Sequence, residues 1–106
     1  MNGELENTMA GIDVLACPST ARASYPVTPE LLYGPIPTDR DPWSGRFTVP
    51  YDFAGLPTIA LPCGLNIDGM PVSLQIAGHH LSEPVLVQIG DAFESASDFH
   101  NLHPAI

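Results

Sequence analysis

The protein has 106 residues, of which 44% are hydrophobic and only 14% are charged. A chain of this length forms one small domain at most, and this composition is closer to the interior of a larger protein than to a self-contained small domain. Acidic residues outnumber basic ones by 12 to 3, which gives a net charge of −9. Because such a field repels phosphate backbones and anionic lipids, we expect neither a nucleic-acid partner nor electrostatic attachment to a membrane.

No run of about 18 apolar residues occurs, which argues against a membrane-spanning helix. The first residues carry Glu4 and Glu6, whereas a signal peptide carries lysine or arginine ahead of an apolar stretch. We therefore expect a soluble, cytoplasmic protein. Cys17 and Cys63 each lie within an apolar run and lack a CxxC partner. Buried, reduced thiols are the favoured interpretation, with a disulfide or a catalytic thiol as the alternative.

The first segments of the chain predict a helix and a strand. Apolar residues at helical spacing and Gly11 predict the end of a helix over residues 3–11. Residues 13–17 form a short apolar run closed by Pro18, which is typical of a strand covered on both faces. Seven prolines lie from Pro18 to Pro50. Residues 18–47 therefore predict a long proline-rich loop or lid, since connections of this length are uncommon unless they serve a site or a partner.

A short helix, a hairpin and a long helix are expected after this loop. Thr48 is a candidate N-cap for a helix with Pro50 in its first turn and Gly55 at its end. Residues 58–61 and 72–78 predict two antiparallel strands joined by a turn at 66–69. Ser82, Glu83 and Pro84 predict a helix start, with the hydroxyl of Ser82 accepting from a free N–H group. An apolar stripe then runs along the helix and consists of Val85, Leu86, Ile89, Phe93 and Ala96. The tail from Asp98 onward shows no periodic pattern of apolar residues.

Four segments in this order resemble the amidase-signature family. They are residues 13–19 (DVLACPS), 46–57 (RFTVPYDFAGLP), 59–64 (IALPCG) and 69–78 (GMPVSLQIAG), the last running into the final helix. Together they span residues ~12 to 104, and four ordered blocks at matching spacing are more specific than any one of them. The resemblance implies an α/β fold in which residues 1–106 form the edge portion of a mixed β-sheet with flanking helices, as in the C-terminal part of the amidase-signature fold.

The resemblance also implies chemistry that this chain does not contain. The family hydrolyses amides with a serine nucleophile, a second serine on a cis peptide bond and a lysine, all in a Gly- and Ser-rich segment upstream of this region. This sequence has no lysine and no such segment, and a serine is a poor nucleophile without a base. We therefore assign no catalytic residue. Another serine triad is permitted by composition alone, but no serine lies in a Gly-x-Ser-x-Gly elbow.

Two positions depart from the family pattern. Asp52 stands where family members usually carry asparagine, and as an anion it accepts but does not donate hydrogen bonds. Gly45 stands where the tRNA-dependent amidotransferase branch carries an acid that holds the amino group of glutamine. Because glycine cannot bind an amino group in this way, we expect a general amidase and not that branch.

Arg46 is the main candidate substrate-binding residue, with Trp43 and Phe47 beside it. A guanidinium can bind a substrate carboxylate or carbonyl, although a salt bridge or aromatic stacking that anchors the loop is the favoured alternative. A second set of residues is expected to have structural roles in the matching motifs: Thr48, Pro50, Asp52, Gly55, Cys63 and Gly64. We expect Thr48 to cap a helix and Asp52 to brace a loop.

We expect no metal and no cofactor. His79-His80 and His100-x-x-His103 bring four imidazoles into a short chain, but surface histidines are the favoured interpretation over zinc or nickel binding. Asp39 and Asp41 beside Arg40 are interpreted as a solvated charge cluster and not as an acid–base pair.

Two functions are compatible with the sequence. The first is the C-terminal part of an amidase-type hydrolase, which supplies sheet edge and pocket wall but is not competent alone, and whose substrate is a small-molecule amide. The second is a non-catalytic, amidase-like remnant that serves oligomerisation or partner binding. In either case, an exposed sheet edge is expected to recruit a second copy or a partner chain.

Overall fold

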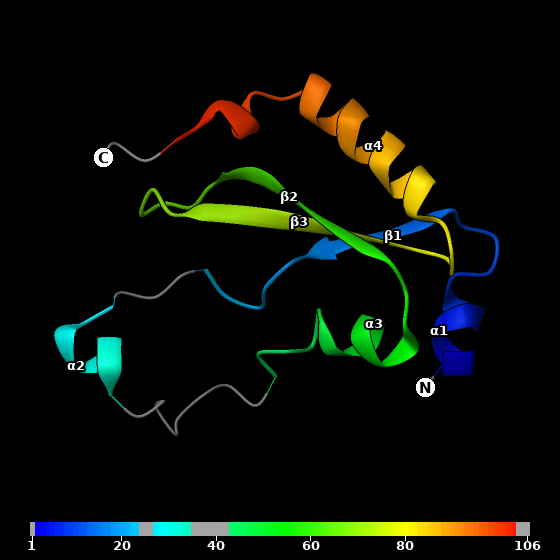
Figure 1. The fold of residues 1–106 in the computed structure, drawn as a ribbon, viewed down its shortest axis with the longest axis horizontal. Helices are drawn as coiled ribbons and strands as arrows, with labels where there is room; N and C mark the ends of the chain where they lie inside the picture. Colours follow the sequence, from blue (N-terminus) through cyan, green and yellow to red (C-terminus); the bar gives the residue numbers. More distant parts are fainter. Residues whose placement is uncertain (1, 24–26, 35–42, 104–106) are drawn as a thin grey trace.

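The computed structural model describes residues 2–23, 27–34 and 43–103. Its elements are α1 (Asn2–Thr8), β1 (Val14–Pro18), α2 (Pro29–Tyr33), α3 (Val49–Ala54), β2 (Thr58–Leu65), β3 (Pro71–Gly78), α4 (Glu83–Ser95) and a short 3-10 helix, η1 (Phe99–Asn101). Figure 1 shows one small sheet with α4 on one side and α1 and α3 on the other. The expected α/β class, part of a β-sheet with flanking helices, is confirmed, and the part observed is an open, antiparallel sheet.

β3 is the central strand of this sheet. The strand order is β1-β3-β2, and both outer strands run antiparallel to β3. Ile76 of β3 lies opposite Ala16 of β1 and Ile59 of β2. Among the described residues every strand pair is thus antiparallel, and β1 and β2 each have one edge without a neighbouring strand.

Two hydrophobic clusters lie on opposite faces of the sheet, because successive side chains of a strand point to opposite faces. The first lies under α1 and α3 and contains Met9, Tyr51, Ala54, Leu56 and Ala77, with Leu5, Leu15 and Cys17 against them. The second lies under α4 and contains Leu61, Ile76 and Leu86, with Val14, Ile59, Leu74, Ile89 and Phe93 against them. Of the apolar stripe predicted for the last helix, Leu86, Ile89 and Phe93 face the sheet as expected, whereas Val85 and Ala96 are exposed.

The expected hairpin is confirmed, and its first strand is longer than predicted. β2 continues to Leu65 through an irregularity between Pro62 and Gly64, where the register to β3 shifts. Asn66 builds the turn, since its Oδ1 atom accepts the backbone N–H groups of Asp68 at 3.0 Å and Met70 at 2.8 Å. An asparagine that accepts bonds from the following backbone is a typical turn residue.

Both ends of α3 were predicted correctly, with Thr48 at the N-cap position and Pro50 in the first turn, but the expected capping bond is absent. Gly55 ends the helix with φ 67° and ψ 28°, and the N–H of Leu56 reaches back to the carbonyl of Tyr51 at 3.1 Å, as in a Schellman motif. Thr48 has helical φ and ψ of −116° and −50° and makes no side-chain cap bond. Its hydroxyl points back to the carbonyl of Gly45 at 3.4 Å. The predicted cap by Thr48 is therefore wrong, because an N-cap residue normally has extended dihedrals.

The predicted hydroxyl cap by Ser82 is also wrong. Helix α4 begins at Glu83 as expected, but the Ser82 hydroxyl donates to the carbonyl of His79 at 2.6 Å and accepts no helix N–H. The hydroxyl thus closes the turn between β3 and α4. A serine side chain often bonds its local backbone in this way in place of a cap.

The long loop contains a helix that was not expected. α2 begins with Thr28 at the N-cap position and Pro29 in the first turn, a helix start signal that the prediction of one long loop or lid overlooked. Figure 1 shows α2 set apart from the sheet, and no residue of α2 is buried. The Asp39–Asp41 cluster lies outside the described residues. Within the described part of the chain, no helix has the length and apolar character needed to cross a membrane.

The expected two-sided cover of the first strand is incomplete within the described residues, since Val14 packs against the cluster under α4 but the other residues on that face do not. β1 is an outer strand, and Ala16 and Pro18 are exposed. Leu15 and Cys17 lie against the cluster under α1 and α3. The apolar composition of residues 13–17 was compatible with a covered strand, but the composition does not show which neighbours are present.

Candidate substrate-binding site

A buried polar contact anchors the segment that precedes α3. Gln75 of β3 is only 6% exposed, and its Nε2 atom donates to the backbone carbonyl of Phe47 at 2.7 Å. The same amide lies 3.8 Å from the Sγ atom of Cys17 on β1. Because a buried amide is costly unless it is hydrogen-bonded, this contact ties the end of the long loop to the centre of the sheet.

Tyr51 of α3 completes this cluster. Its hydroxyl lies 3.6 Å from the Sγ atom of Cys17, and its side chain is buried. Burial, and then the hydrogen bond and charge interaction with the Cys17 thiol, raise the pKa of Tyr51 to about 12. The phenol is therefore neutral at physiological pH and acts as a structural group between α3 and β1.

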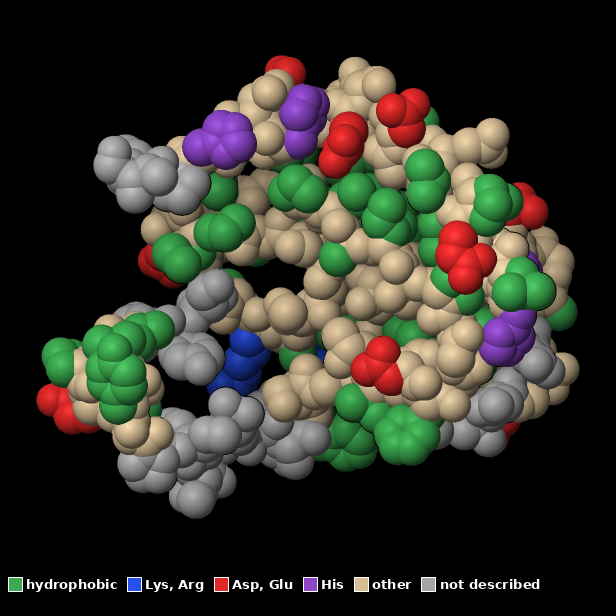
Figure 2. All heavy atoms as spheres, in the orientation of Figure 1, with side chains coloured by type: hydrophobic (Ala, Val, Ile, Leu, Met, Phe, Trp, Pro, Cys, Tyr) green, Lys and Arg blue, Asp and Glu red, His purple; other side chains and the backbone are tan. Residues whose placement is uncertain are grey.

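A hollow of about 410 Å³ lies on the outer side of this anchored segment. Its lining residues come from the end of the long loop and the start of α3: Trp43, Ser44, Gly45, Arg46, Val49 and Pro50. Figure 2 shows basic side chains within an opening on this face of the molecule, whereas the acidic side chains lie elsewhere on it. The fold thus places a cation beside an indole and aliphatic groups.

Two of the three candidate binding residues share this hollow. Trp43, which is 68% exposed, and Arg46 both line it. Phe47 does not line it; its ring lies under the guanidinium of Arg46, with 5.1 Å between Cζ and the ring centroid. This cation–π contact orients Arg46, in agreement with an anchoring role for this side chain. Whether Arg46 also binds substrate stays a prediction.

Gly45 shapes the floor of the hollow. A Cβ atom at this position would lie 2.7 Å from Cγ2 of Val49, which real Cβ atoms essentially never tolerate. The carbonyl of Gly45 also accepts the N–H groups of Thr48 at 3.1 Å and Val49 at 2.9 Å. A larger residue at position 45 would therefore require Val49 to move. In this chain the wall at position 45 carries neither a side chain nor a charge.

Three other motif residues, Asp52, Cys63 and Gly64, do not line the hollow. Asp52 is exposed in the first turn of α3, and its expected bracing role stays a prediction. Cys63 donates its thiol proton to the carbonyl of Val72 at 3.6 Å, inside the hairpin. Gly64 has φ 148°, at the irregularity of β2.

The histidines provide no metal site in the described part of the chain, where no group of three potential ligands comes together. The Nε2 atom of His79 lies 2.9 Å from the carbonyl of Ile12. This contact links the segment after β3 to the segment before β1.

Sequence reasoning missed two residues that build the site, Gln75 and Tyr51. The sequence indicated them only as parts of a strand and a helix. A signal was present for Gln75, because it is the one long polar side chain among the apolar residues of 74–78. Its partner at Phe47 lies 28 positions away, a separation that no local pattern reveals.

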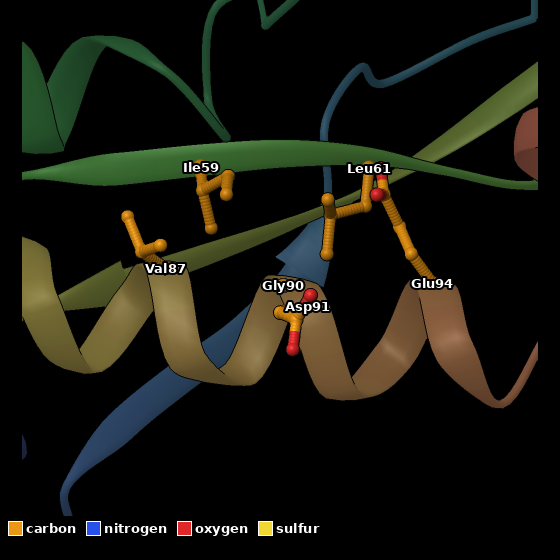
Figure 3. Close-up of a pocket in the computed structure, with 6 residues that line it drawn as sticks. All are labelled: Ile59, Leu61, Val87, Gly90, Asp91 and Glu94. Carbon is orange, nitrogen blue, oxygen red and sulfur yellow. The ribbon is translucent and has the colours of Figure 1, made fainter.

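A second hollow of about 240 Å³ lies between β2 and α4. It is lined by Ile59 and Leu61 of β2 and by Val87, Gly90, Asp91 and Glu94 of α4. Figure 3 shows Ile59 and Leu61 directed from the strand toward the helix. We call this hollow the edge groove, since β2 is an outer strand of the sheet.

Comparison with known proteins gives one family. The family model described as Amidase matches residues 1–87. Relatives named as a subunit of glutamyl-tRNA(Gln) amidotransferase are 31% identical in Bacillus thuringiensis (strain Al Hakam) and 32% identical in Bacillus cytotoxicus, each over 105 residues. Each alignment covers 94% of this chain but only 20% of the relative, so the chain spans about a fifth of the length of these relatives. The expected family is confirmed: the chain belongs to the amidase family.

Proposed function

We propose that this chain is the C-terminal part of an amidase-type hydrolase, which cleaves carbon–nitrogen bonds in small-molecule amides. It supplies a sheet edge and one wall of the substrate pocket. The catalytic serines and lysine come from polypeptide outside this segment, and the chain is not competent alone. The observation that carries the proposal is that the family match covers most of the chain while the chain spans only a fifth of its relatives.

The sequence supports the division of roles. It contains no lysine, so the proton acceptor that the family resemblance implies must come from elsewhere. A serine hydroxyl without such a base reacts slowly. This chain contributes the hollow beside Trp43 and Arg46, which the Gln75–Phe47 hydrogen bond holds on the sheet.

The geometry around position 45 supports a general amidase. The name of the relatives refers to one component of an amidotransferase, and these relatives are much longer proteins. Gly45 and Val49 leave an uncharged wall next to Arg46. A substrate ammonium finds no carboxylate among these lining residues. We therefore propose a neutral or anionic amide substrate.

An open sheet favours the alternative function, a non-catalytic remnant that binds a second copy or a partner chain. Both outer strands have one free edge among the described residues, and several large apolar side chains are exposed, including Phe53 at 71% and Ile67 at 101%. Free strand edges and exposed apolar surface recruit further strands. Under either function we propose a cytoplasmic protein.

The size of the native protein distinguishes the two functions. Intact mass and an immunoblot against residues 43–103 are measured in source cells. A species several-fold heavier than 11.3 kDa, which hydrolyses a chromogenic anilide after purification, supports the amidase. An oligomer built from 11.3 kDa chains with no hydrolysis supports the remnant and overturns the amidase.

A further inference from the structure

The edge groove lies beside backbone groups of β2 that point away from the sheet. The N–H of Gly78 donates to the carbonyl of Pro57 at 3.0 Å, so these two residues form a hydrogen-bonded pair between β3 and β2. In an antiparallel ladder alternate residues bond to opposite sides. Residues 57, 59 and 61 therefore bond to β3, and Thr58 and Ala60 direct their N–H and C=O groups outward.

Proline limits the length of this free edge. Pro62 follows Thr58 and Ala60 at the same two-residue spacing, so its backbone nitrogen also faces outward. Proline in a sheet is confined to positions whose N–H would face away from the ladder. An incoming strand can therefore bond to Thr58 and Ala60 but finds no donor at Pro62. The edge accepts a short strand, and uncontrolled extension along β2 is blocked.

The groove next to this edge is apolar at its floor. Leu61 is only 5% exposed, whereas Val87 on the helix side is 63% exposed. Gly90 brings α4 close to the strand, since a Cβ atom there would lie 2.9 Å from Cδ1 of Ile59. Apolar side chains of an added strand, on the face that carries Ile59 and Leu61, would cover Val87 and fill this space.

The rim of the groove is acidic. Asp91 and Glu94 belong to its lining, and Figure 3 shows the Glu94 side chain reaching toward β2. The lining of the groove contains no basic side chain to balance these two carboxylates. A second copy of this chain is poorly suited as occupant, because it has a net charge of −9, no lysine and only three arginines. Like-charged surfaces repel each other.

We propose that the edge groove binds an extended polypeptide segment that carries apolar and basic side chains on one face and adds as a fourth strand beside β2. Its backbone bonds to Thr58 and Ala60, an apolar side chain packs on Val87, and a lysine or arginine pairs with Asp91 and Glu94. This mode is strand addition at a sheet edge, with backbone bonds for affinity and side chains for specificity. The inference rests on the proposed function, because it specifies the polypeptide that completes the sheet.

The test measures binding of a fluorescent peptide to the full 106-residue chain by fluorescence anisotropy. The probe is a capped hexapeptide with the sequence Thr-Val-Thr-Lys-Thr-Val, in which the two valines and the lysine share one face. Its control replaces the lysine by glutamate. We expect saturable binding of the lysine peptide at low salt, at least about tenfold weaker binding of the glutamate peptide, and loss of most of this difference at about 0.5 M salt because screening weakens exposed ion pairs.

Two variants separate the backbone and charge contributions. Ala60→Pro removes an outward N–H and should weaken binding at least about tenfold, while Ala16→Pro, a matched change at the outward edge of β1, should leave it within about twofold. Asp91→Asn with Glu94→Gln should weaken binding about fivefold, which corresponds to roughly 1 kcal/mol and is the range of exposed ion pairs. Circular dichroism of each variant checks that the sheet is retained.

The outcomes are decisive in both directions. Equal affinity for the two peptides, no saturable binding, or equal effects of the two proline changes overturns the inference. The charge variant is conservative, so it still tests the rim if a proline variant fails to fold. Hydrolysis by a larger native species without peptide binding leaves the proposed function intact and removes only this inference.

Discussion

The side-chain amide of Gln75 donates a hydrogen bond of 2.7 Å to the backbone carbonyl of Phe47. This bond connects the central strand to the residue that follows Arg46, and so it fixes the position of the hollow relative to the sheet. Both the stability of the chain and the shape of the candidate site are therefore expected to depend on it.

Gln75→Leu should destabilise the chain by about 1–3 kcal/mol, because the carbonyl of Phe47 loses its donor within a partly buried site. The free energy of unfolding is measured by urea denaturation. Gln88→Leu on the exposed side of α4 is the matched control and should change the stability by less than about 0.5 kcal/mol. Similar losses in both variants would show that the Gln75 bond has no special role.

Gly55→Ala should cost about 1 kcal/mol, because Gly55 has φ 67° and left-handed backbone is unfavourable for residues with a Cβ. Space is not the cause, since the nearest atom to such a Cβ is Cε1 of His80 at 3.8 Å. Gly55→Asn should therefore recover part of the loss, because asparagine tolerates this conformation. Urea denaturation of the two variants checks the order, and an alanine variant as stable as the parent would contradict it.

Gly78→Ala should destabilise the chain by about 1–3 kcal/mol through overpacking. The new Cβ overlaps the Ser82 hydroxyl, which bonds to His79, and lies 3.3 Å from Cδ2 of Leu86. Gly3→Ala in α1 is the control, since no atom lies within 4 Å of its added Cβ. Thermal unfolding should show a lower midpoint for the first variant and an equal or higher one for the control.

Tyr51 should make stability sensitive to alkaline pH. Its pKa is raised to about 12 from an ordinary value of 10.0, so folding favours the protonated phenol. This contribution is fully present below pH 10 and is lost as the pH rises from 10 toward 12. Tyr51→Phe should remove this loss, whereas Tyr33→Phe, at a side chain that is 97% exposed, should not. Denaturation midpoints across this pH range make the comparison, and parallel curves for all three proteins would be the contrary result.

Arg46→Ala should raise the KM of the native hydrolase by about tenfold with little change in kcat, if Arg46 contributes binding that the ground state and transition state share. Arg46→Lys should recover part of the effect, because a lysine keeps the charge but not the planar fork of donors. Gln88→Ala, on the exposed side of α4, is the control. A lower stability with an unchanged KM would assign Arg46 to loop anchoring alone.

The sequence by itself determined the local elements and the family. The turn at Asn66, the helix end at Gly55 and the apolar stripe of α4 depend on dihedral preferences and on spacing within a few residues. The four ordered blocks carried the family resemblance. The turn and the helix end depend only on a short stretch of the chain, whereas the resemblance depends on the order of four short blocks along it. The turn, the helix end and the family were all confirmed.

Only the tertiary structure decided which distant groups meet. Phe47 and Gln75 are 28 positions apart, and Cys17 and Tyr51 are 34 positions apart. The hydroxyls of Thr48 and Ser82 bond to preceding carbonyls and not to helix N–H groups, a choice set by the backbone that leads into each helix. The free edge of β2 likewise follows from strand order. The physical reason is that packing selects one partner among many that local preferences allow.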